Sequence, residues 1–126
     1  MRFALLVYEN AAHWATVAKD VKAQCTDACL AWHNDLATRG KLPTALVLHE
    51  PGTAASVRQR ADGFTVTDGP FAETKEVLGG VEVVECASQE EAIAIAQAFP
   101  ALAHGFTVEV RRVITLEEQL QRMRDA

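Results

Sequence analysis

The stretch RFALLVY at residues 2–8 is apolar on both of the faces that an extended chain presents. Phe3, Leu5 and Val7 would lie on one face of a strand, and the intervening side chains on the other are apolar too. A strand with two apolar faces is expected in the middle of a sheet, where both faces are covered. We therefore predict a central β-strand over residues 2–8.

The chain after this strand predicts one helix and two further strands. Apolar residues recur at spacings of three and four between residues 16 and 39, which is typical of a long amphipathic helix, and Gly40 follows as its C-terminal cap. Residues 42–49 then form a predicted strand. We expect the Pro-Gly turn at residues 50–53 to join that strand to an antiparallel partner at residues 56–60.

The second half of the chain predicts three further strands and two helices. A turn at residues 61–63 leads into further predicted strands at residues 64–68, 78–86 and 106–113. Ser88-Gln-Glu-Glu91 is a capping box that begins a helix over residues 92–99, which Pro100 ends. A second capping box, Thr115-Leu-Glu-Glu118, predicts a short terminal helix with an apolar side.

This order of elements predicts an α+β fold: a ferredoxin-like antiparallel sheet with helices on only one face. We expect residues 1–114 to form this domain and residues 115–126 to be a helical extension. The uncovered face of the first strand is apolar and needs a cover, because no third layer of the chain is left to bury it. We predict a homodimer whose sheets meet face to face, with a pocket between sheet and helices or at the dimer seam.

Composition excludes several classes of function. The 126 residues carry 12 basic and 17 acidic side chains, a net charge of −5, with the basic residues scattered, so nucleic acid is not an expected partner. No apolar run approaches the roughly 18 residues of a membrane span, and no signal pattern begins the chain. Three cysteines, an odd number, suit a reducing compartment. We predict a cytoplasmic protein without a membrane partner.

The charged loop at residues 67–76 is the most distinctive segment. Asp68 continues the phase of Phe64 and Val66, so its carboxylate is expected to face an apolar space, where it would suit general acid or base chemistry. The alternative is that Asp68 caps the following turn by accepting backbone hydrogen bonds. For the other charged residues of this loop, a solvated surface is the simpler interpretation.

At this loop the chain resembles a known family. Asp68-Gly69-Pro70-Phe71, with the downstream Glu73-Thr74-Lys75-Glu76 and Leu78-Gly79-Gly80, resembles the DGPF-motif branch of the YCII-related family. The resemblance extends from the opening strand to residues 104–111. It implies a dimeric α+β barrel in a bacterial cytoplasmic protein and does not by itself assign an activity.

Some relatives resemble lyases or dehydrochlorinases with a His/Asp dyad, but the matching positions here are near Cys29 and at Phe99. A catalytic member of this branch must therefore use other groups. We nominate Asp68 and His104, because both lie at strand ends beside glycines. A simpler role for His104 is a hydrogen bond within its loop. The residues that we expect to bind a substrate are Tyr8, Arg58, Glu73 and Lys75.

Cys25, Cys29 and His33 lie at i, i+4 and i+8 of the first predicted helix, a spacing that gathers soft metal ligands along one stripe. Apolar neighbours share the stripe, and no second ligand pair follows, so we expect core packing, with neither metal nor cofactor.

Two functions remain. The first is the binding of a small molecule in a dimeric barrel pocket, and the second is a lyase or isomerase in which Asp68 and His104 transfer protons.

Overall fold

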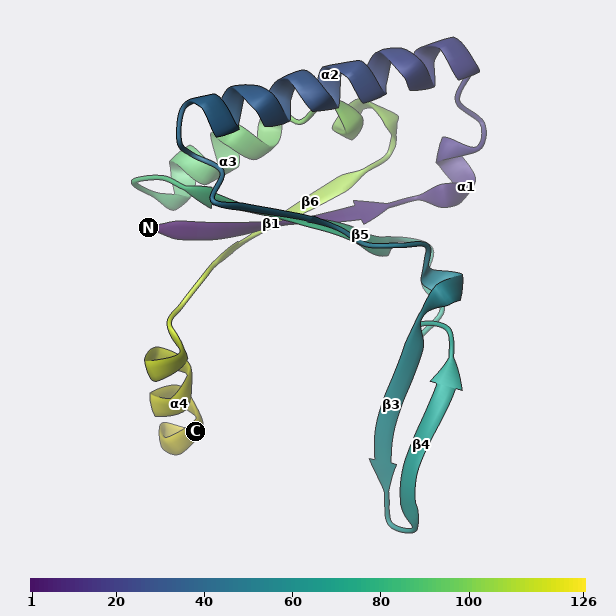
Figure 1. Cartoon of the computed structure of the whole chain (residues 1–126), viewed down its shortest axis with the longest axis vertical. Helices are drawn as coiled ribbons and strands as arrows, with labels where there is room; N and C mark the ends of the chain where they lie inside the picture. Colours follow the sequence, from purple (N-terminus) through teal and green to yellow (C-terminus); the bar gives the residue numbers. More distant parts are fainter.

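A computed structural model describes residues 1–126 and contains a four-stranded antiparallel sheet (Figure 1). The strands lie in the order β2-β5-β1-β6, where β1 is Arg2–Glu9, β2 Thr44–Val47, β5 Val77–Glu85 and β6 Thr107–Arg112. The first strand pairs with β5 on one side and β6 on the other. The predicted central position of this strand is therefore confirmed.

Helices cover one face of this sheet, so the predicted mixed α+β class is confirmed (Figure 1). The covering elements are α2 (Lys19–Thr38), α3 (Gln89–Gln97), the short α1 (Ala11–Trp14) and the 3₁₀-helix η2 (Pro100–His104). The single helix predicted for residues 16–39 begins later, because Asn10 caps the separate helix α1 and Ala18 is extended. None of the helices has the length and apolar character that crossing a membrane requires.

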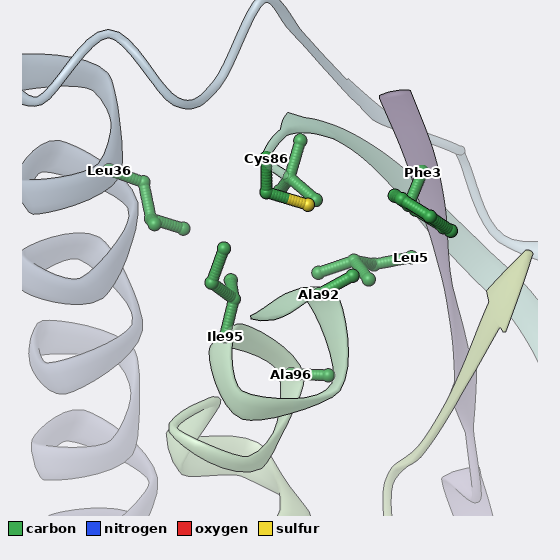
Figure 2. Packing of buried hydrophobic residues seen from close by; sticks show 8 residues of the cluster. Phe3, Leu5, Leu36, Cys86, Ala92, Ile95 and Ala96 are labelled. Atoms are coloured by element: carbon green, nitrogen blue, oxygen red, sulfur yellow. The ribbon is translucent and has the colours of Figure 1, made fainter. Parts of the chain in front are cut away.

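The hydrophobic core lies between the sheet and these helices (Figure 2). Phe3 and Leu5 of β1 point toward Leu36 of α2 and toward Ala92 and Ile95 of α3. Full burial of a large apolar side chain contributes roughly 1.5–3 kcal/mol, so these contacts hold the two layers together. The other face of the sheet, which we call the open face, receives no helix from this chain.

The predicted hairpin between residues 42–49 and 56–60 is wrong. Strand β2 pairs with β5, from Thr44 opposite Val83 to Val47 opposite Gly80. Residues 51–53 form the 3₁₀-helix η1 (Pro51–Thr53), which leads the chain out of the sheet instead of reversing it within the sheet. The turn residues alone therefore do not determine which strand β2 pairs with, because strand pairing depends on the tertiary context.

Two segments extend from the sheet on the side away from the helices, at opposite ends of the molecule (Figure 1). One is a hairpin of β3 (Ala55–Arg60) and β4 (Gly63–Asp68), whose tight turn uses Gly63 at φ +129°. The other is α4 (Leu116–Asp125), which buries no side chain and is capped, as predicted, by Thr115 Oγ1 accepting from Glu118 N at 3.1 Å.

The N-terminus of α3 confirms the first capping box and ties the helix to its surroundings. Ser88 Oγ accepts from the backbone N–H of Glu91 at 3.2 Å, and Glu91 Oε2 accepts from Ala87 N at 2.8 Å. Lys41 Nζ donates to Glu91 Oε1 at 2.7 Å and holds the pKa of that carboxyl below its usual range. Helix α3 contributes three buried residues to the protein, so its cap affects global stability.

We predict that Ser88→Ala lowers the free energy of unfolding by about 1 kcal/mol, because one backbone N–H of the first turn loses its acceptor. Ser88→Asp keeps an acceptor at the same place and should retain most of that stability. Urea unfolding followed by circular dichroism measures both variants. An equal loss in the two variants would show that packing, rather than capping, accounts for the role of Ser88.

Candidate functional site

A cavity of about 570 Å³ lies at the base of the β3–β4 hairpin, and we call it the hairpin cavity. It forms where β1 and β5 meet η1 and the loop that follows β4. Its apolar lining includes Leu48, Pro51, Ala54, Pro70, Phe71 and Leu78. Its polar lining consists of Tyr8, His49, Glu50, Thr53, Thr74 and Glu76.

An irregularity in the ladder positions Tyr8 at this cavity. Val7 lies opposite Gly80, but Tyr8 lies opposite Leu78, so the register shifts by one residue and Gly79 is left over. A Cβ atom at position 79 would lie 2.5 Å from the Glu9 carboxyl carbon, so glycine makes room for that side chain. Bulges of this kind commonly redirect a side chain at a site, and here the one affected is Tyr8.

The Asp-Gly-Pro-Phe segment is held by three hydrogen bonds to β3 and to Ala54, the residue just before it. Ser56 Oγ donates to Gly69 O at 2.8 Å, and Gly69 N donates to Ala54 O at 2.6 Å. Arg58 Nη2 donates to Phe71 O at 2.7 Å. Gly69 adopts φ +93°, a conformation that side chains with a Cβ disfavour. Together these contacts position Phe71 at the wall of the cavity.

The polar groups of the hairpin cavity are mostly hydrogen-bond acceptors. His49 Nδ1 accepts from Glu50 N at 2.8 Å, which leaves Nε2 to carry the proton of the neutral ring. Glu76 Oε1 accepts from Thr107 Oγ1 at 3.0 Å, so the loop is also anchored to β6. Two glutamates, one histidine and Tyr8 therefore line a largely apolar cavity.

The structure places the predicted substrate-binding residues in different surroundings. Tyr8 lines the hairpin cavity, and Lys75 lines an adjoining recess that Tyr8 also borders. Arg58 lies outside the lining and acts through its bond to Phe71. Glu73 is an exposed loop residue outside both linings.

The two residues nominated for catalysis lie on different elements. Asp68 ends β4 and is exposed, as are Phe64 and Val66 on the same face, so the apolar surroundings predicted for its carboxylate are not present in the single chain. After β4, the backbone N–H of Gly69 donates to Ala54 O on the opposite arm of the hairpin. His104 lies in η2, with its ring 6.0 Å from that of Trp14. Neither residue lines the hairpin cavity, and their catalytic role stays a prediction.

Part of the lining was not identified from the sequence. Leu48 and Pro51 were assigned to a strand and a tight turn, and they reach the cavity only because β2 pairs with β5. Glu76 was expected to be a solvated loop residue; it is exposed, and it also bonds to Thr107 and borders the cavity. The Gly79-Gly80 pair was the one sequence feature that could have indicated this site, since glycines within a strand often mark a bulge or a close approach of another backbone.

Comparison with known proteins gives the following relations. Residues 1–117 match the YCII-related domain. An uncharacterized protein of Rhizobium meliloti (strain 1021), R00369, is 33% identical over 97 residues, which cover 77% of this chain and 78% of that protein. Among solved structures, 5-chloro-2-hydroxyhydroquinone dehydrochlorinase (TftG) from Burkholderia phenoliruptrix AC1100, in complex with 2,5-dihydroxybenzoquinone, superposes with a TM-score of 0.52. It is 16% identical, and the match covers 94% of this chain and 98% of that chain, so it shows a shared fold.

We predict that Arg58→Leu loosens the loop at residues 69–76, because Phe71 O loses its charged donor. Amide hydrogen exchange in this loop should become at least about threefold faster, measured by mass spectrometry at fixed pH. Asp68→Asn is the matched control, as it removes a charge from the same hairpin without removing any of the three anchoring bonds. Asp68→Asn should leave the exchange rate of the loop unchanged. It should change the free energy of unfolding by no more than about 0.5 kcal/mol. Faster exchange in Asp68→Asn alone would contradict this account.

Proposed function

The chain belongs to the YCII-related family, and on this premise we propose that it is a small-molecule-binding protein whose ligand occupies the hairpin cavity. The observation that carries the proposal is the cavity itself. Its volume of about 570 Å³ lies within the range of small-molecule sites, and its apolar wall with a few convergent polar groups is the usual composition of such sites.

The lining indicates the chemistry of the ligand. Because Glu50 and Glu76 present acceptors and His49 presents one N–H, a largely apolar compound that donates hydrogen bonds is favoured over an anion. Lys75, in the adjoining recess, is proposed to contact a polar substituent, and Glu73 to lie at the rim. Arg58 supports the site indirectly, by holding Phe71 in place.

A homodimer is the second part of the proposal. Leu6 of β1 and its partner Val81 of β5 lie on the open face, and Leu46 of β2 continues this apolar row with its side chain 55% exposed. The hairpin and α4 flank this face at its two ends and leave it accessible between them (Figure 1). A second sheet placed there would form the dimeric α+β barrel and would close one side of the hairpin cavity.

A lyase or isomerase activity with Asp68 and His104 is the alternative function. Its support is the fold shared with a dehydrochlorinase, which is named in complex with a small cyclic ligand. Fold alone does not determine an activity, and Asp68 and His104 lie on separate elements, so ligand binding is the better supported function. We also propose a bacterial source and a cytoplasmic location, which the family resemblance implies.

We predict that the hairpin cavity binds the uncharged fluorescent probe N-phenyl-1-naphthylamine, whose emission rises in apolar surroundings. Phe71→Ser should weaken binding at least about fivefold, since it removes an aromatic wall, whereas Phe64→Ser, an equally exposed position outside the lining, should not. Fluorescence titration measures both. Absence of saturable binding, or a loss confined to Phe64→Ser, would refute the hairpin cavity as the ligand site.

We further predict that the protein sediments as a dimer at micromolar concentration and that Leu46→Lys weakens the dimer at least about tenfold, because it places a charge on the open face. Val47→Lys is the matched control: the neighbouring side chain is 86% exposed and points to the other side of the same strand. Sedimentation equilibrium over a dilution series distinguishes the two variants. A wild-type monomer throughout the series would exclude the barrel.

A further inference from the structure

The β3–β4 hairpin has one largely apolar face and one polar face. Val57 lies opposite Val66 in its register, and side chains alternate between the two faces along each strand. The face that holds this pair, which we call the hairpin face, consists of Ala55, Val57, Phe64 and Val66, with Gln59 and Asp68 beside them. The opposite face carries only polar side chains: Ser56, Arg58, Arg60, Thr65 and Thr67. Such alternation is typical of strands that are buried on one side and solvated on the other.

The hairpin face has no cover within the single chain. Strands β3 and β4 pair only with each other, as a separate sheet of two strands. Val57 and Val66 are each 66% exposed, and Phe64 is 75% exposed. A two-stranded hairpin by itself is marginally stable at best in water, and packing against another element is what stabilises it. The hairpin face therefore needs a partner that its own chain does not supply.

The accessible surface of the whole chain is too large for a compact monomer. It measures 8796 Å², whereas a compact monomer of 13.7 kDa exposes about 6,600 Å². The excess of about 2,200 Å² is well above the roughly 800 Å² that each partner buries in an interface of standard size. The open face, with four strands about 4.8 Å apart and about 20 Å long, has a footprint of only about 400 Å². Surface beyond the open face is therefore also left for a second copy to cover.

The hairpin is placed to reach a second copy that lies on the open face. It extends on the side of the sheet away from the helices, which is the side where a second sheet would pack (Figure 1). Packed sheets lie about 10 Å apart, whereas strands of six residues span about 20 Å. An arm of this length extends past the second sheet and lies beside the second copy. Twofold symmetry gives each copy such an arm.

We propose that the hairpin face is a docking surface for a second copy of this chain, so that each copy of the dimer is held by the hairpin of the other. The apolar side chains of the face pack against the second copy, and the polar face stays in water. This inference rests on the proposed homodimer and adds a contact that the open face does not make. Because Arg58 of β3 bonds to Phe71 O, docking of the arm also fixes a wall of the hairpin cavity.

Nuclear magnetic resonance of a mixed dimer tests the docking directly. Uniformly ¹³C-labelled and unlabelled protein are unfolded and refolded together, and isotope-filtered spectra then select nuclear Overhauser effects between the two copies. We expect such effects from the ring of Phe64, whose signal is identified by its absence in Phe64→Ser. A dimer in which this ring contacts only its own chain would overturn the docking and leave the open-face dimer standing. A monomer throughout would exclude the proposed dimer and the docking together.

Two variants of β4 measure how much the hairpin face contributes to the dimer. Val66→Lys places a charge on this face and should raise the dimer dissociation constant at least about tenfold in sedimentation equilibrium. Thr67→Lys places the same charge on the next residue, which points to the polar face, and should change that constant less than about twofold. Neither residue lines the hairpin cavity, so dimeric Val66→Lys should bind the fluorescent probe as the wild type does. Equal dissociation constants in the two variants would refute the docking.

Discussion

The structure depends on one constraint: β1 is apolar on both faces, but the chain supplies helices for only one of them. Burial of Phe3 and Leu5 against α2 and α3 forms the core and sets the strand order around β1. The same alternation leaves the opposite row of side chains, including Leu6, on the open face. The proposed dimer follows from this imbalance, because apolar surface left in water favours association.

The hairpin cavity is a consequence of how the sheet ends. The register shift at Tyr8, the exit of the chain through η1 and the three bonds that hold the Asp-Gly-Pro-Phe segment all occur at the same end of the sheet. Each is a small local departure from regular structure. Together they form the walls of the hairpin cavity, and a rigid scaffold that carries irregular loops is a common design for binding sites.

The hairpin is the clearest departure from the rule that apolar side chains are buried. Val57, Phe64 and Val66 share one of its faces and are mostly exposed, because no other element of the chain covers them. A contiguous apolar surface of this kind marks a place where a partner binds. By contrast, the capping boxes at Ser88 and Thr115 obey local rules, and they sit where helices begin.

The elements that could be predicted from the sequence are those whose signals are local. The central strand follows from apolar runs, α3 and α4 from capping boxes, and the mixed α+β class from the order of elements. The partner of β2 depends on tertiary structure, because the Pro-Gly segment is compatible with either pairing and the backbone of β2 bonds to β5. The same holds for the hairpin cavity: Tyr8 and Phe71 are far apart in the chain, and their proximity depends on strand register, which no local pattern specifies.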